Sequence, residues 1–117
     1  MEAAQRTASA TVSDVALARA VLTAARGVGG VTDISRGRYA IIRTIGLGGD
    51  SVEGVQLAHR ADGLWVEVHL VVRPVPLPPL AAAVRAAVAA ALAQAGALVT
   101  AVDVWIDGLA APEAGEP

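Results

Sequence analysis

Hydrophobic and polar residues alternate most clearly between Leu64 and Arg73. Five aliphatic side chains fall on one side of an extended backbone: Leu64, Val66, Val68, Leu70 and Val72. The intervening residues fall on the other side: Trp65, Glu67, His69, Val71 and Arg73. A period of two residues is the pattern of a strand with one buried face. The sequence therefore predicts a long strand, relative to which the other elements can be placed.

A hairpin is predicted directly before this strand. Asp62-Gly63 is a favoured pair for a two-residue type I′ turn, and the preceding segment, Val52–Arg60, is predicted as one strand. This turn places Arg60 opposite Trp65, and it brings the aliphatic residues of both strands to one face.

A first helix is predicted from Asp14 to Arg26, with an aliphatic side facing the core. Ser13 precedes it as a suitable N-cap residue, and Gly27 follows it at the position of a left-handed C-cap.

A second helix is predicted from Pro79 to Gly96, because aliphatic residues recur every four positions at Leu80, Val84, Val88 and Leu92. Its opposite face carries no charge and consists of alanines: Ala82, Ala83, Ala86, Ala89, Ala90 and Ala93. A solvated helix face normally carries several charged residues. We therefore expect the alanine face to be covered by the first helix or by another subunit.

Further strands are predicted up to Ile34, over Tyr39–Ile45 and over Val99–Asp107. A strand, helix, strand order in one sheet implies two parallel strands with a right-handed crossover. The predicted fold is α+β: a two-layer sandwich in the order helix, strands, helix, strand. Its mainly antiparallel sheet of three to five strands has both helices on one face.

Length and composition predict a single domain over residues 13–109. Residues 1–12 and 110–117 are expected to form disordered tails, because they have few large apolar side chains. The apolar region Leu80–Val102 is interrupted by Arg85, Gln94 and Gly96, which argues against a membrane span. The N-terminus does not resemble a secretory signal, so we expect an intracellular protein.

Enzyme chemistry and cofactor binding are not expected. The chain has no cysteine, which excludes disulfides and thiol catalysis, and it has no Gly-x-Ser-x-Gly nucleophile motif. Gly46-x-Gly48-Gly49 is followed by neither a helix nor a Lys-Ser/Thr pair, so it is expected to be a plain loop. No small-molecule substrate is predicted.

Two histidines and several carboxylates are candidate metal ligands. Glu67, His69, Asp103 and Asp107 project from the same predicted face. They could form a carboxylate and imidazole metal site if the strand 64–73 and the strand 99–107 are neighbours in the sheet. The preferred interpretation is a set of solvated charges, with His69 beside Gln56 on the neighbouring strand. His59 is expected at a strand end, on the opposite face from His69.

Nucleic-acid binding is the less favoured alternative. Arg36, Arg38 and Arg43 surround Tyr39, a combination that could bind single-stranded RNA in a small α+β module. However, the net charge is −2, and the chain has one tyrosine and no phenylalanine. A solvated hairpin therefore explains these residues better.

The two tryptophans indicate a protein contact. Trp65 and Trp105 lie opposite the aliphatic rows of their strands, and aromatic residues at such positions often mark interfaces. The predicted interface comprises Trp65, Trp105, Arg60, Glu67 and Asp103. The alternative is that the Arg60 side chain covers Trp65 and a tail covers Trp105.

The order of elements resembles that of the alkaline shock protein (Asp/Gls) family of envelope stress response proteins. The resemblance covers residues 13–109. It rests on three segments: the Val-Gly-Gly-Val turn at 28–31 after the first helix, the proline-rich segment 73–79 before the second helix, and segment 96–109, which contains the last strand and the glycine that follows it. Residues 73–78 replace the Tyr-Gly segment found in the family. The second helix also lacks most of the family's Gln, Lys and Glu.

The resemblance implies a non-enzymatic, cytoplasmic scaffold protein, peripheral at the inner face of the cell membrane. Its implied partners are further copies of itself and a small membrane-anchoring protein. It brings no catalytic residues.

Overall fold

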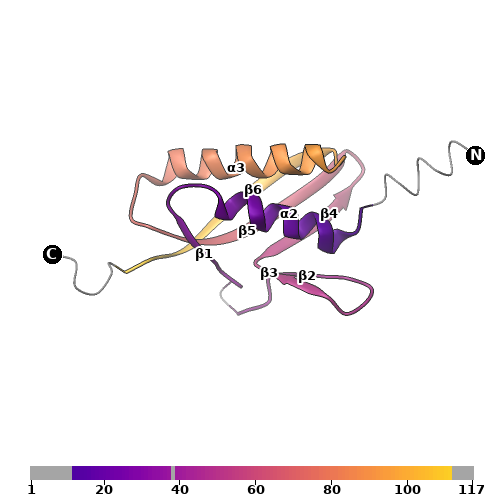
Figure 1. Cartoon of the computed structure of the whole chain (residues 1–117), viewed down its shortest axis with the longest axis horizontal. Coiled ribbons are helices and arrows are strands. Elements are labelled where there is room, and N and C mark those ends of the chain that lie inside the picture. The colour runs from indigo at the N-terminus through magenta and orange to yellow at the C-terminus, as the bar shows by residue number, and fades with distance from the viewer. Residues whose placement is uncertain (1–11, 38, 112–117) are drawn as a thin grey trace, which may run out of the picture.

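The computed structural model describes residues 12–37 and 39–111. Two helices, α2 (Asp14–Arg26) and α3 (Leu77–Gln94), lie side by side against a β-sheet (Figure 1). The sheet contains β1 (Val31–Ile34), β4 (Val55–Arg60), β5 (Gly63–Val72) and β6 (Val99–Leu109). A separate two-stranded ladder joins β2 (Arg43–Ile45) to β3 (Ser51–Glu53). The predicted α+β two-layer sandwich is confirmed.

Strand β5 is paired along both of its edges. On one edge it pairs antiparallel with β4 and then with β1, and on the other it pairs in parallel with β6. His69 lies where the first edge changes partner: its N–H donates to the Gly54 carbonyl (2.9 Å), and its carbonyl accepts from the Ser35 N–H (2.8 Å). The predicted parallel pairing across the strand–helix–strand unit is confirmed.

The core lies between the helices and one face of β5. All five aliphatic residues of the predicted row are buried. Each helix also contributes buried residues to this core: Val15, Leu17, Ala18, Val21 and Ala25 from α2, and Leu80, Val84, Val88 and Leu92 from α3. Burying one such aliphatic side chain larger than alanine stabilises the fold by roughly 1.5–3 kcal/mol.

The predicted strand Val52–Arg60 is wrong, because the chain divides it at Gly54 into β3 and β4. Gly54 has φ +85°, and a Cβ there would collide with Ile34 and lie 2.8 Å from the Ser35 carbonyl. The predicted strand Tyr39–Ile45 is likewise reduced to three residues, preceded by a turn in which Ala40 has φ 56°.

The predicted hairpin register was wrong by two residues. The turn is Ala61-Asp62, so Arg60 pairs with Gly63 and Ala58 lies opposite Trp65. Gly63 has φ +134°, and a Cβ there would lie 2.7 Å from the Leu98 carbonyl, so this glycine allows β6 to approach closely. A shift of two residues keeps every side chain on its predicted face.

The helix ends differ in detail from the prediction. Ser13 caps α2 by accepting the Ala16 N–H at 3.1 Å, as expected. However, Gly27 has φ −76° and is not left-handed. Helix α3 begins two residues before Pro79. Its predicted stop is confirmed, because Gly96 follows the C-cap residue Ala95 in a left-handed conformation with φ +85°.

The ends of the domain are only partly described. Strand β6 runs two residues past the predicted end, and the Ala110 N–H donates to the Val72 carbonyl at 2.7 Å. Residues 1–11 and 112–117 of the predicted tails lie outside the described residues.

The first helix does not cover the alanine face of α3. Five of its six alanines are exposed, and Ala89 is half-buried. By length and composition alone, α3 could cross a membrane, with a mean hydropathy of 1.4 over 18 residues. The core helix of a two-layer domain meets the same criterion, and the four aliphatic residues of α3 are indeed buried against the sheet. Another subunit remains the predicted cover for the alanines.

We expect Gly54→Ala to lower the free energy of unfolding by about 1–3 kcal/mol, because it forces a side chain into a left-handed and occupied position. Gly48→Ala is the matched control, since no atom lies within 4 Å of a Cβ there. Urea unfolding measures both variants, and equal stability would contradict the assigned role of Gly54.

We expect Ala86→Glu to weaken self-association, because a carboxylate would be buried where two α3 helices meet. Gln94→Glu adds one negative charge at the last residue of the same helix, at the edge of the alanine face where a polar side chain already stands, and should weaken association much less. Sedimentation velocity of the two variants tests this. An unchanged oligomeric state for Ala86→Glu would mean that the alanine face is exposed to solvent and forms no subunit contact.

Candidate protein-interaction surface

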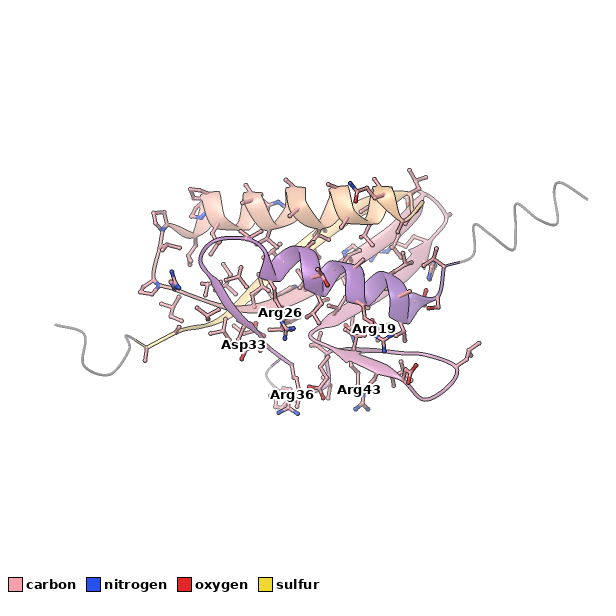
Figure 2. All side chains as sticks on the ribbon, in the orientation of Figure 1. Arg19, Arg26, Asp33, Arg36 and Arg43 are labelled. Carbon is pink, nitrogen blue, oxygen red and sulfur yellow. The ribbon has the colours of Figure 1, made fainter. Side chains whose placement is uncertain are left out.

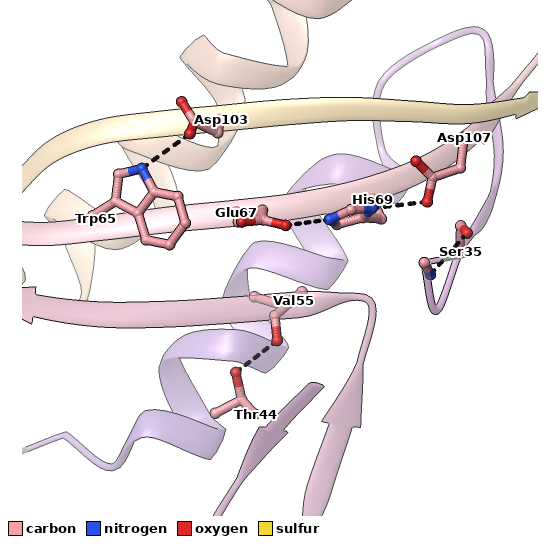
Figure 3. Close-up of polar contacts among 9 residues, drawn as sticks. Ser35, Thr44, Val55, Trp65, Glu67, His69, Asp103 and Asp107 are labelled. Carbon is pink, nitrogen blue, oxygen red and sulfur yellow. Dashed lines mark hydrogen bonds and ion pairs between the residues drawn. The ribbon is translucent and has the colours of Figure 1, made fainter. Parts of the chain in front are cut away.

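One face of the sheet carries no helix, because α2 and α3 both pack against the other face. We call it the outer face and define it by the residues that β4, β5 and β6 project from it: Arg60, Trp65, Glu67, His69, Asp103, Trp105 and Asp107. The parallel register places Glu67 beside Asp103 and His69 beside Trp105. Figure 3 shows the contacts of Trp65 with Asp103 and of His69 with Glu67 and Asp107. All five residues of the predicted interface therefore share one surface.

Trp65 is held by two polar contacts. Its indole N–H donates to Asp103 Oδ2 at 3.1 Å, and the Arg60 guanidinium carbon lies 5.0 Å from its ring centroid, within cation–π range. The first part of the alternative, that Arg60 covers Trp65, is thus confirmed, and the half-buried ring is anchored within the sheet. The second part concerns a tail of which residues 112–117 lie outside the described residues.

Trp105 is the more open of the two tryptophans. Its ring stacks on the His69 imidazole with centroids 5.4 Å apart and planes 7° apart, yet its residue is 52 % exposed. One ring face is therefore supported from beneath while much of the side chain meets solvent.

His69 is the buried centre of this surface. Its Nδ1 lies 2.8 Å from Asp107 Oδ2, and its Nε2 contacts Glu67 Oε2. Ionised carboxylates only accept hydrogen bonds, so a doubly protonated imidazolium can donate to both of them. The residue is only 6 % exposed.

The prediction that His69 is a solvated neighbour of Gln56 is therefore wrong. Gln56 pairs with Glu67, and the imidazole lies beneath Trp105. Trp105, which covers the imidazole, belongs to β6, and β6 reaches the edge of β5 only after the chain has crossed over through α3.

The metal-site alternative is not supported. Within residues 12–37 and 39–111, no group of three or more metal-ligating side chains is arranged to hold an ion. Both His69 ring nitrogens already face carboxylates. His59 lies on the opposite face, as predicted, and its Nε2 is 2.8 Å from Asp14 Oδ1.

The predicted basic cluster is partly neutralised. Arg36 Nε lies 3.3 Å from Glu53 Oε2, whereas Arg43 lies opposite the same glutamate in the strand register without an ion pair in the described part of the chain. Tyr39 is 72 % exposed. Arg38 lies outside the described residues.

The glycine-rich segment forms the turn between β2 and β3. The Gly46 N–H donates to the Asp50 carbonyl at 2.7 Å, and a strand rather than a helix follows. This is the plain loop that the sequence predicts.

A hollow of about 380 Å³ lies beside Trp65. The β2 residues Arg43 and Ile45 form one side, and Gln56 and Ala58 of β4 form another. Sequence reasoning missed this hollow, because it depends on where the β2–β3 ladder lies relative to β4.

Solved structures with a similar fold are carboxyl-terminal domains (CTDs) of MamM. The MamM CTD in its copper form gives a TM-score of 0.54 at 17 % identity, covering 87 % of this chain and 89 % of that one. A variant in a zinc form gives 0.48 at 15 % identity, covering 87 % and 92 %. No protein-family model and no curated protein matches the sequence. At this identity, the likeness concerns the fold alone.

We expect His69→Ala to destabilise the domain by roughly 1–3 kcal/mol or more, because two partly buried carboxylates lose their shared donor. His59→Ala is the matched control: it removes an exposed ion pair, worth about 0.2–1 kcal/mol. Thermal melting of both variants tests the difference. Equal melting temperatures would mean that His69 does not brace the outer face.

Proposed function

We propose that this chain is a non-enzymatic interaction module that binds protein partners through its outer face. The observation that carries the proposal is Trp105, half exposed and stacked on a buried histidine that two carboxylates hold in place. A side chain fixed before binding loses little conformational entropy on association, and tryptophan is enriched among the residues that dominate interfaces.

The same contacts argue against catalysis at this face. Glu67 and Asp107 bind the two nitrogens of one imidazole, and Asp103 binds the Trp65 indole. These groups are engaged in structural hydrogen bonds. For the same reason, we do not extend the copper or zinc named for the MamM CTD to this chain.

More specifically, we propose a scaffold of the envelope stress response type, in the alkaline shock protein family. It would act at the cytoplasmic side of the cell membrane through a small membrane-anchoring partner. The family resemblance over residues 13–109 supports this, and the order helix, strands, helix, strand fits it.

Self-association is part of the proposal. Two surfaces are available for it, the outer face and the alanine face of α3, and both expose apolar atoms without a covering element in the described part of the chain. Symmetric pairing through one such surface is the commonest form of homo-oligomer.

We expect Trp105→Ala to weaken self-association or partner binding by about thirtyfold, the loss that corresponds to roughly 2 kcal/mol at an interface centre. Its melting temperature should change little. Trp65→Ala should also lower stability, because it removes the contacts with Asp103 and Arg60. Sedimentation velocity and capture of the membrane-anchoring protein measure association, and thermal melting measures stability.

Leu98→Ala is the control, since Leu98 is an exposed apolar residue outside the outer face. Unchanged association with a large drop in the melting temperature of Trp105→Ala would contradict the proposal. Steeply salt-dependent binding of RNA would favour the nucleic-acid alternative instead.

A further inference from the structure

Exposed large apolar side chains concentrate in one short segment. Of the nine such residues in the described part of the chain, four lie between positions 39 and 47: Tyr39, Ile41, Ile45 and Leu47. Ile41 and Ile45 are 61 % and 60 % exposed, and Leu47 is fully exposed in the β2–β3 turn. Figure 1 shows this hairpin projecting from the body of the domain.

The hairpin is attached to the domain by its other side. The buried Thr44 hydroxyl donates to the Val55 carbonyl at 2.8 Å, and Val52 is buried in the core. Gly46 lies against α2, where a Cβ would be 2.7 Å from Val15 Cγ2. Because these contacts fix the inner side, the neighbouring residue Ile45 faces outward.

Arginines lie along the same edge of the molecule. Arg19 and Arg26 project from α2, Arg43 belongs to β2 of the hairpin, and Arg36 lies on the neighbouring loop (Figure 2). Five of the nine arginines in the sequence fall between positions 19 and 43, although the whole chain carries a net charge of −2.

Carboxylates offset only part of this charge. Glu53 pairs with Arg36, Asp33 also lies on this edge (Figure 2), and the exposed Asp50 lies in the β2–β3 turn itself. Arg19, Arg26 and Arg43 have no ion-pair partner within 4.0 Å among residues 12–37 and 39–111.

We propose that the β2–β3 hairpin binds directly to an anionic lipid surface, with Leu47 and Ile45 inserted among the acyl chains and the arginines at the headgroups. Binding of this kind combines burial of apolar area with attraction to anionic lipid. Each arginine near such a surface contributes about fivefold to affinity.

Two features favour lipid over a macromolecular partner. Nucleic-acid strands stack their bases on aromatic rings, but three of the four exposed side chains are aliphatic. A single projecting turn suits a deformable interface better than the broad, complementary patch that a stable protein contact requires. The inference goes beyond the proposed scaffold function, because this contact requires no anchoring protein.

The test is co-sedimentation of the purified chain with vesicles of phosphatidylcholine, with and without phosphatidylglycerol. We expect binding to the anionic vesicles only, falling as salt is raised. Leu47→Asp should weaken binding at least tenfold, and Arg43→Glu at least fivefold. Melting temperatures should be unchanged, since both side chains are exposed.

Matched controls make the same changes elsewhere. Leu98→Asp alters another exposed leucine, and Arg85→Glu alters an exposed arginine on α3. Neither should reduce vesicle binding as much as its hairpin counterpart.

Several results would overturn the inference. These are failure of the wild-type chain to bind anionic vesicles, equal binding by Leu47→Asp, and complete displacement of the vesicles by a single-stranded oligouridine, which would assign the edge to nucleic acid. A change in oligomeric state for Leu47→Asp without loss of vesicle binding would also contradict it. None of these results bears on Trp105, so the two proposals can fail separately.

Discussion

Pairing of β5 along both edges is the constraint on which the rest of the structure depends. With β4 and β1 on one side and β6 on the other, the strand cannot shift by one residue without exposing its aliphatic row. Both helices bury their apolar sides against that row. Because the helices occupy one face, Trp65, Glu67 and His69 are presented on the other.

The parallel neighbour β6 gives the outer face its rigidity. It brings Asp103 to the Trp65 indole and Asp107 to the His69 imidazole, and Trp105 then closes over that ring. A buried imidazole with a carboxylate at each ring nitrogen is a demanding arrangement, since loss of one member leaves a buried polar group without its partner. Trp105 is therefore held in place by its stacking on His69, whose ring is in turn fixed by Glu67 and Asp107.

The domain leaves three kinds of surface outside its core: the aromatic outer face, the alanine face of α3 and the arginine-rich edge with its projecting hairpin. They lie on different elements, and the outer face adjoins the hairpin at the hollow that Arg43 and Ile45 share with Trp65. Such a division suits a scaffold better than an enzyme, which would concentrate its polar groups in one cavity.

Much of this protein follows from its sequence alone. Strict alternation over residues 64–73 and the four-residue spacing of aliphatic residues in α3 predicted the central strand, the second helix and the buried face. These signals depend on side-chain periodicity, which is local. For the same reason, Trp65 and Trp105 were placed correctly on the outer face, and His59 and His69 on opposite faces.

Only the tertiary structure decided the rest. The division of the strand at Gly54 and the use of Gly63 for close approach of β6 arise from contacts with Ile34, Ser35 and Leu98, which lie far away in the sequence. The sequence predicts a solvated strand residue at position 69, whereas in the fold β6 places Trp105 and Asp107 against His69. Alternation specifies the face on which a side chain lies, whereas its burial and hydrogen-bond partners depend on which strand lies beside it and in what register.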